Sequence, residues 1–290
     1  MRPAAAVAGL RALAGPAALA ALPALAACSA APHSHDRAVP SSPGEATAED
    51  AQARSAHRWD VPPPGRVLMV GNSFTFWNGG LWRPLAAALD SEGRGVTVEP
   101  CVEGGASLET HWHRDEVLDR IDAGEADVVV LQGDIPESTL ASFEEHAGKL
   151  IELVRDAGAR PVLFMTWDYE RLGWLSLEEI ITAHRGVALG QNVQVVPVGE
   201  AFGIARRERP DLDLYAADRE HPSQAGSFLA LVMLAMSLGA DDVESIVPPR
   251  RWRQLAPLDL AYLRDLGQRV CEQETRRVRE LHGSKAFCPN

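Results

Sequence analysis

The chain has 290 residues, of which 46% are hydrophobic and 23% are charged, and its formal net charge is −12 at pH 7. This composition is that of a globular protein with its own core, and the length suits one α/β domain with extensions. The excess of acidic residues argues against a nucleic-acid partner, because binding to a phosphate backbone needs clustered Lys and Arg.

The N-terminal segment has the features of an export signal. Two arginines stand near an uncharged run at residues 12–27, which is too short and too rich in small residues to predict a transmembrane helix. The run ends in Leu25-Ala26-Ala27-Cys28, which resembles the lipobox of bacterial lipoproteins. This resemblance implies a signal peptide at 1–27, lipidation of Cys28, and an extracytoplasmic protein held on a bacterial membrane by its lipid anchor only. Ordinary signal-peptidase cleavage near Ala27, with Cys28 incidental, is the alternative.

Residues 28–64 are rich in Ala, Ser, Pro, Gly, His and acidic residues and have no apolar periodicity, which predicts a disordered tether. His33 and His35 lie in this tract without Cys or carboxylate at ligand spacing, so we expect them to be solvated rather than metal-bound.

Residues 65–275 are predicted to form one folded domain, followed by a C-terminal tail at 276–290. Short apolar, β-branched runs alternate there with amphipathic stretches, which is typical of a parallel sheet with crossover helices. The expected strands are residues 66–70, 96–102, 127–131, 161–166 and 193–198. The expected helices are residues 81–89, 108–121, 143–156, 177–188, 224–238 and a last one from about 258 to the region of 280.

Right-handed crossovers between these strands predict a three-layer α/β/α sandwich with a flavodoxin-like, doubly wound parallel sheet of five strands. In that topology the end of the first strand lies at the switch point, where ligands bind. The first expected strand runs directly into the turn Gly71-Asn72-Ser73-Phe74-Thr75. A serine in such a turn is exposed at the carboxyl edge of the sheet, and it can be a nucleophile or simply a helix cap.

A second motif, Asp218-Arg219-Glu220-His221-Pro222, lies in the loop before the helix expected at 224–238. A general base takes the serine proton with one ring nitrogen while a carboxylate holds the other, and Asp and His three residues apart can make that contact within one loop. Alone, these residues could be ordinary surface residues. Because the topology brings both motifs to one edge of the sheet, their joint occurrence favours a Ser-His-Asp triad.

Together the two motifs resemble the SGNH (GDSL-like) hydrolase superfamily over roughly residues 66–268. The resemblance implies a serine hydrolase that cleaves carboxylic esters through an acyl-enzyme, with Ser73 as nucleophile, His221 as base and Asp218 orienting the histidine. It implies an oxyanion hole formed by the Ser73 N–H and by two residues from later sequence motifs of the family, a glycine from its second motif block and an asparagine from its third. The glycine corresponds best to Gly105, with Gly104 as the alternative. This chemistry needs no metal and no organic cofactor.

The third block departs from the family pattern, because the third strand ends in Leu131-Gln132-Gly133-Asp134 where the family has Gly-x-Asn-Asp. Gln132 could supply the amide donor of the missing asparagine, or it could cap a loop. A poorly characterised branch of the superfamily, with Leu-Gln here, a histidine at the position of His111 and a Thr-Trp as in Thr166-Trp167, is more similar to this chain. Asn72, His111 and Trp167 are the candidate substrate contacts.

Other residues have two interpretations each. His111 and His113 could contact substrate or bind a metal, but structural histidines are the more common case. Trp77 could stack on a sugar ring or pack on the sheet. By family analogy the partner is an ester substrate, either an acylated glycan or a small acyl ester. The alternative is a non-catalytic, glycan-binding lipoprotein on the same fold, since the departure from the family pattern at residues 131–134 could indicate an enzyme that has lost its activity.

Three cysteines remain after Cys28, and pairing is expected in an oxidising compartment. Cys271 and Cys288 form the predicted disulfide, because a short polar stretch separates them and a bridge would hold the C-terminal tail. Two unpaired thiols are the alternative, and Cys101 is expected to be free.

Overall fold

The structure, a computed structural model, describes residues 64–91, 93–136, 138–252 and 255–282. The predicted signal peptide, Cys28, Cys288 and almost all of the predicted tether lie outside these residues. The strands are β1 (Arg66–Gly71), β2 (Thr97–Val102), β3 (Val128–Gln132), β4 (Arg160–Phe164) and β5 (Gln194–Val196). All neighbours pair in parallel, in the order β2-β1-β3-β4-β5. The predicted doubly wound sheet of five strands is therefore confirmed.

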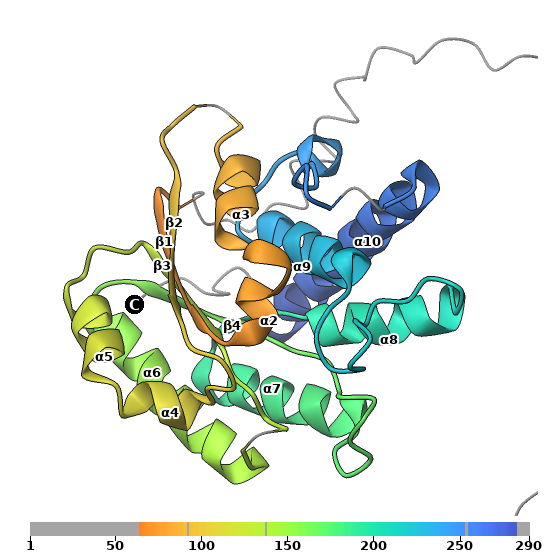
Figure 1. The fold of residues 1–290 in the computed structure, drawn as a ribbon. Helices are drawn as coiled ribbons and strands as arrows, with labels where there is room; N and C mark the ends of the chain where they lie inside the picture. Colours follow the sequence, from red (N-terminus) through yellow and green to blue (C-terminus); the bar gives the residue numbers. More distant parts are fainter. Residues whose placement is uncertain (1–63, 92, 137, 253–254, 283–290) are drawn as a thin grey trace, which may run out of the picture. The chain divides into compact units, whose positions relative to one another are not determined.

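Helices cover both faces of the sheet, which confirms the predicted three-layer sandwich (Figure 1). On one face lie α4 (Leu108–Trp112), α5 (Asp115–Asp122), α6 (Leu140–Asp156) and α7 (Leu177–Gln191). On the other lie α3 (Trp82–Leu89), α8 (Val198–Glu208), α9 (Gln224–Ser237) and α10 (Pro257–His282).

The central strand β1 is buried on both faces. Val67 and Met69 point into the core shared with α3, α8 and α9, whereas Leu68 and Val70 point into the core shared with α4 to α7. A parallel strand covered on both faces is apolar at successive positions, which is why this segment has no polar alternation. The turn that follows it, at residues 72–76, is therefore attached to a strand that is buried on both faces.

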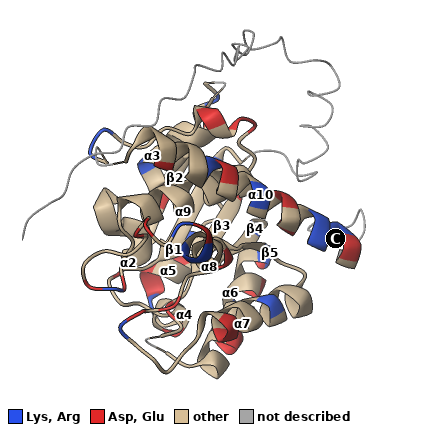
Figure 2. Ribbon diagram, turned by 90° about the vertical axis from the view of Figure 1, so that its right-hand side faces the viewer, with Lys and Arg blue, Asp and Glu red and all other residues tan. Residues whose placement is uncertain are grey.

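Helix α9 is buried on nearly all sides, because α10 packs along its outer surface (Figure 1). Acidic and basic residues alternate on α10 (Figure 2), where Arg269 pairs with Asp265 at 2.8 Å and with Glu208 of α8 at 2.9 Å. Helix α10 continues to His282, past the predicted end of the domain at residue 275. The apolar side of the helix continues with it, since Val278 is buried.

Two elements differ from the prediction. The helix expected at 108–121 is broken into α4 and α5 at Arg114, which adopts an extended conformation and pairs with Glu103 and Glu116. Helix α8 was not predicted, because Val198 was assigned to the end of a strand. Gly199 allows α8 to pack closely, since a Cβ there would lie 2.0 Å from the Thr166 carbonyl oxygen.

Cys101 and Cys271 are buried, free thiols, as predicted for Cys101. The Cys271 sulfur faces α9, 3.6 Å from Ser237 Oγ and 3.9 Å from Met233 Sδ. Burial raises its pKa to about 12, so the thiol is inert at neutral pH. The partner predicted for Cys271, Cys288, lies outside the described residues, so the bridge between them stays a prediction.

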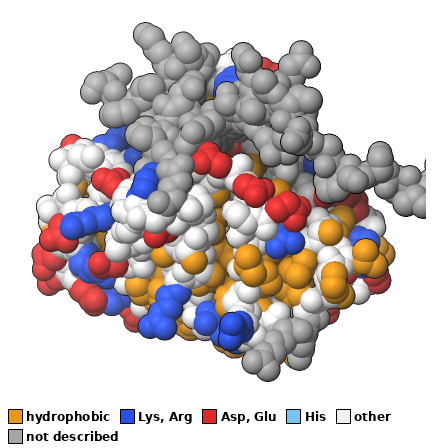
Figure 3. Space-filling view, turned by 90° about the horizontal axis from the view of Figure 1, so that it is seen from above, with side chains coloured by type: hydrophobic (Ala, Val, Ile, Leu, Met, Phe, Trp, Pro, Cys, Tyr) orange, Lys and Arg blue, Asp and Glu red, His pale blue; other side chains and the backbone are white. Residues whose placement is uncertain are grey.

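Seen from above, apolar side chains gather on one part of the surface, while acidic and basic side chains are mixed over the rest (Figure 3). Exposed apolar atoms are a normal part of protein surfaces, so surface composition does not mark a site. Among the described helices, none combines the length and the apolar character that crossing a membrane would need.

Candidate active site

Ser73 follows β1 by two residues and begins the short helix α2 (Ser73–Phe76). Asn72 caps this helix, because its side-chain oxygen accepts a hydrogen bond from the Phe74 N–H at 3.0 Å. The turn passes so close to β3 that a Cβ on Gly71 would lie 2.7 Å from Gln132 Oε1, so a larger residue there would displace the Gln132 side chain. The Ser73 side chain is thus held at the carboxyl end of β1, at the switch point of the sheet.

The structure brings Ser73, His221 and Asp218 together as predicted. Ser73 Oγ lies 2.8 Å from His221 Nε2, and His221 Nδ1 lies 2.8 Å from Asp218 Oδ2. Because a carboxylate only accepts hydrogen bonds, the ring hydrogen is on Nδ1, and Nε2 presents its lone pair to the serine hydroxyl. This is the geometry in which an imidazole can remove the serine proton.

Asp218 is held as a carboxylate. Partial burial alone would raise its pKa, but hydrogen bonds from the His221 ring and from the backbone N–H groups of His221 and Glu220 outweigh burial and lower it. The two backbone bonds, 3.0 and 3.1 Å long, both reach Asp218 Oδ1 and leave Oδ2 for the ring. The aspartate therefore shapes the loop and orients the histidine at the same time.

Residues 215–222, here named the catalytic loop, form a tight hairpin. Tyr215 and Pro222 make an antiparallel bridge, and the Ala216 N–H donates to the His221 carbonyl at 2.7 Å. Arg219 has a φ of +59°, a conformation that costs a non-glycine residue free energy and persists only where its surroundings fix it. The contacts of Arg219 supply that fixation.

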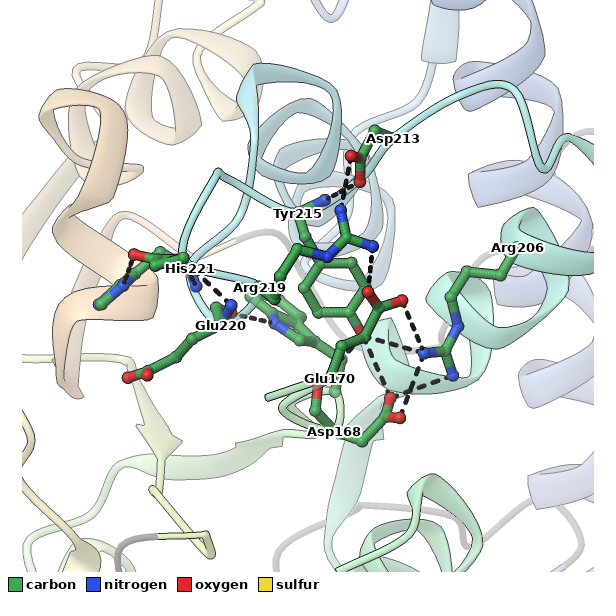
Figure 4. Close-up of polar contacts among 10 residues, drawn as sticks. Asp168, Glu170, Arg206, Asp213, Tyr215, Arg219, Glu220 and His221 are labelled. Atoms are coloured by element: carbon green, nitrogen blue, oxygen red, sulfur yellow. Dashed lines mark hydrogen bonds and ion pairs between the residues drawn. The ribbon is translucent and has the colours of Figure 1, made fainter. Parts of the chain in front are cut away.

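An ion-pair network clamps the catalytic loop to the segment after β4 and to α8 (Figure 4). Arg219 pairs with Glu170 and, at 2.6 Å, with Asp213. Glu170 also pairs with Arg206 of α8 at 3.4 Å, so one carboxylate joins the loop to that helix.

A second set of contacts extends this network. Tyr215 donates its hydroxyl to the Asp168 carbonyl at 3.0 Å, and Arg206 pairs with the Asp168 carboxylate at 3.1 Å. The indole N–H of Trp167 donates to the Glu220 carbonyl at 2.9 Å, next to His221. The segment after β4 thus fixes the backbone of the catalytic loop at several points.

Aromatic rings hold the imidazole from the other side. The Trp77 ring stacks on His221 with 3.8 Å between centroids and 15° between planes, and Phe74 meets it edge-on at 5.8 Å. Asn78 Nδ2 donates to the carbonyl oxygens of Pro222 and Ser223, at 2.9 and 3.1 Å. The segment after Ser73 therefore supports both the ring and the loop of the base. Trp77 thus packs, as one of its two interpretations expected, but onto the histidine rather than onto the sheet.

Gln132 does not occupy the position predicted for an oxyanion donor. It is fully buried, its Oε1 accepts from the Asn72 N–H at 2.7 Å, and its Nε2 donates to the Gly133 carbonyl at 2.9 Å. Its amide therefore fixes the backbone immediately before Ser73. Strand order places Gln132 beside the turn at residues 72–76, here named the nucleophile turn. The prediction was wrong because strand order does not say on which side of this turn the long side chain lies.

The three candidate substrate contacts are buried as well, and the prediction for each is wrong. Asn72 Nδ2 donates to Asp134 Oδ2 at 2.7 Å. His111 Nε2 lies 3.0 Å from the Gly71 carbonyl, and burial lowers its pKa to about 4, so the neutral ring donates there. Trp167 stacks on Phe202 at 4.1 Å. All three support the site from beneath, because each has a polar partner or a ring partner inside the protein.

Gly105 lies in the loop that follows β2, beside the nucleophile turn. This loop is tied to the turn by two hydrogen bonds, from the Glu103 N–H to the Gly71 carbonyl at 3.1 Å and from Asn72 Nδ2 to the Ala106 carbonyl at 3.3 Å. Gly105 is exposed and has a φ of +69°, which favours glycine. Among the described residues, no acceptor pairs with its N–H or with that of Ser73.

Sequence reasoning did not predict which residues hold the catalytic loop in place. Nothing local in the sequence relates Glu170 to Arg219, or Asn78 to Pro222, because these pairs meet only after folding. Asp134 was noted only as a departure from the family pattern, yet its carboxylate accepts from both Asn72 and the Tyr169 hydroxyl, at 2.7 and 2.6 Å. The available signal in the sequence was the position of Asp134 just after a predicted strand.

No family model and no curated protein matches the chain. Among solved structures, one similar protein is a candidate SGNH hydrolase from Slackia heliotrinireducens, with 30% sequence identity, a TM-score of 0.51, and coverage of 60% of this chain and 98% of that one. A variant of Axe2, an acetyl-xylooligosaccharide esterase from Geobacillus stearothermophilus, has 16% identity, a TM-score of 0.52 and coverage of 62% and 97%. A lipase/acylhydrolase from Enterococcus faecalis has 18% identity, a TM-score of 0.50 and coverage of 60% and 94%.

The second and third of these likenesses show the fold alone. The first combines the fold with substantial identity along nearly the whole of the related protein, and the residues it covers in this chain are enough to include the whole sheet. On this basis the chain belongs to the SGNH hydrolase superfamily.

Proposed function

We propose that the protein is a serine esterase or acylhydrolase in which Ser73, His221 and Asp218 are the catalytic triad. The observation that carries this proposal is the continuous line of two 2.8 Å hydrogen bonds from Ser73 through His221 to Asp218. A carboxylate, an imidazole and a serine in this order convert a weakly nucleophilic hydroxyl into an effective one.

In the proposed reaction, His221 Nε2 accepts the Ser73 proton as Ser73 Oγ attacks the carbonyl carbon of an ester. The alcohol leaves with that proton, and an acyl-Ser73 intermediate remains. Water then attacks the acyl-enzyme with His221 again as base, which releases the acid and restores the serine. Asp218 stabilises the imidazolium in both halves.

The oxyanion hole in this proposal consists of the backbone N–H groups of Ser73 and Gly105. Gly105 is exposed, and among the described residues no protein acceptor pairs with either N–H, which supports this assignment. Gln132 supports the hole indirectly, because it holds Asn72 in place. Gly104 and the Gln132 side chain are no longer needed as donors.

We propose carboxylic esters as the substrate class, with O-acetylated glycans as its first member to test. The likeness to an acetyl-xylooligosaccharide esterase motivates that choice. The glycan-binding alternative without catalysis has no specific observation in its favour, because nucleophile, base and carboxylate are all present and in contact.

The test is turnover of acetyl, butyryl and octanoyl esters of p-nitrophenol and of acetylated xylooligosaccharides, with Ser73→Ala as the control. A fluorophosphonate probe should add one label at Ser73, detected by peptide mass. Ser73→Ala should lose turnover and labelling while keeping its thermal transition, because the change removes only one hydroxyl group, whose single side-chain partner among the described residues is His221. Turnover by Ser73→Ala at the wild-type rate would overturn the proposal.

We also propose that the protein is exported and anchored through Cys28, with residues 28–64 as the tether to the domain. The Leu25-Ala26-Ala27-Cys28 motif after an uncharged run supports this proposal.

A further inference from the structure

Two histidines and a glutamate meet on the opposite side of the sheet from α9. Glu109 lies on α4, His113 caps the C-terminal end of α4, and His146 lies on α6. One ligand atom from each lies within 4.8 Å of the others. Glu109 and His113 are four residues apart and so share a face of one helix, while α6 packs against that face and brings His146.

The Nε2 atom of His146 is oriented to bind a ligand, because the other ring nitrogen is held by the backbone. Its side chain is 6% exposed, and its Nδ1 lies 2.8 Å from the Ser142 carbonyl oxygen. Because a carbonyl only accepts, the ring hydrogen is on Nδ1, and Nε2 carries a lone pair that no described residue occupies. A backbone carbonyl that fixes the far ring nitrogen is the usual second-shell partner of a metal-bound histidine.

The carboxylate is oriented in the same way. Ser142 Oγ donates to Glu109 Oε2 at 2.6 Å, which leaves Oε1 without a partner among the described residues. The rings of His113 and His146 lie with their centroids 6.0 Å apart. Lys149, three residues after His146, pairs with Glu145 at 2.6 Å, and Arg114, next to His113, pairs with Glu103 and Glu116, so both cations have carboxylate partners outside the cluster.

We propose that Glu109, His113 and His146 form a zinc-binding site that joins α4 to α6. Two imidazoles and one carboxylate are ligands that suit Zn²⁺ and not the hard cations Mg²⁺ and Ca²⁺, and a water molecule would complete a tetrahedron. Zinc–ligand distances of about 2.0–2.2 Å require the three donor atoms to approach one another by roughly an ångström. The exposed side chains of Glu109 and His113 can make this adjustment.

The site is separate from the reacting atoms and differs from the sequence-based expectation of no metal. Zinc binding would affect the triad through α4. On this helix His111 makes a hydrogen bond to the carbonyl of Gly71, two residues before Ser73. Zinc would therefore stiffen the support of the nucleophile turn without taking part in the reaction.

The test is calorimetric titration of ZnCl₂ into the full chain after treatment with EDTA. We expect one site of micromolar or tighter affinity, and a cobalt-substituted protein with the visible absorption of tetrahedral Co²⁺. Zinc at roughly 100 times its dissociation constant should raise Tm by about 5 °C. Mg²⁺ and Ca²⁺ should have no such effect.

His113→Ala is the decisive variant, because His113 is exposed and its loss should not affect folding. It should abolish the site, and Glu109→Gln should weaken it by at least about tenfold, the loss that follows even from removing outer-shell partners. Glu144→Gln, which changes an exposed carboxylate on α6, is the matched control and should bind zinc as the wild type does. The double variant His33→Ala, His35→Ala should also retain the site.

Wild-type affinity in His113→Ala, loss of binding in the His33/His35 double variant, or no titratable zinc in the wild type would each overturn the proposal. Esterase turnover is measured in parallel. Because the proposed hydrolase needs no metal, EDTA-treated protein should still turn over esters, so failure of the zinc site leaves the triad assignment untouched.

Discussion

The indole of Trp77 lies flat against the imidazole of His221, with 3.8 Å between ring centroids. Trp77 belongs to the segment that follows the nucleophile, so one stretch of chain carries the serine and also braces its base. Stacking of this kind limits rotation of the histidine out of line with Ser73 Oγ.

Trp77→Ala should lower kcat by about tenfold and change KM little, because a small displacement of a catalytic group is enough to cost rate. Trp77→Phe should retain most of the activity, since a smaller ring can still stack. Steady-state kinetics and the rate of phosphonate labelling measure both effects. Equal kcat in Trp77→Ala and wild type would show that the ring does not position the base.

Asp218→Asn should lower kcat by roughly 10⁴ and leave binding intact. The asparagine oxygen can still accept from the two backbone N–H groups, but its amide would donate to Nδ1 and force the ring hydrogen onto Nε2. Asp211→Asn is the matched control, because Asp211 pairs with Arg209 and lies outside the catalytic loop. A loss below tenfold in Asp218→Asn would remove Asp218 from the triad.

Gln132→Ala should lower the free energy of unfolding by about 2–4 kcal/mol, because it leaves the buried Asn72 N–H without an acceptor and creates a cavity. Urea unfolding measures this loss. An oxyanion donor would behave differently, with an unchanged free energy of unfolding and a kcat lowered by about 10² to 10³. That second pattern would restore the role predicted from the sequence.

The free energy of unfolding should fall as the pH drops from about 6.5 toward 4. Burial lowers the pKa of both His111 and His184 to about 4, so between these values the unfolded chain binds protons that the folded protein does not. Each histidine should contribute a slope of roughly 1 kcal/mol per pH unit. Urea unfolding at several pH values measures the slope, and His184→Gln should reduce it. An unchanged slope in that variant would contradict the buried, neutral state of His184.

Cys28→Ser should release the protein from membranes and leave its catalytic domain active, because the predicted anchor is the only hydrophobic attachment expected. Fractionation of cells that express the two forms, followed by an esterase assay of each fraction, measures this. Membrane retention of Cys28→Ser would contradict the lipobox.

The sequence was sufficient to predict the strands and the contact between Asp218 and His221, because both depend on local patterns. β1 and β3 are continuous apolar runs, and Asp218 and His221 are close enough in sequence to meet within one loop. Contacts between distant segments were not predictable in this way. The directions of the Gln132 and His111 side chains depend on which partner each finds inside the folded protein. Helix α8 was missed because its first residue, Val198, was assigned to the preceding strand.

The positions of Ser73, His221 and α10 along the chain determine the order in which these parts of the site are synthesised. His221 stands two positions before the cap of α9, and 148 positions separate it from Ser73. The last helix, α10, supplies the outer cover of α9. During synthesis Ser73 therefore leaves the ribosome long before His221, and α10, which covers α9, follows later still. The hydrogen bond between Ser73 and His221 can form only after most of the described chain has been made.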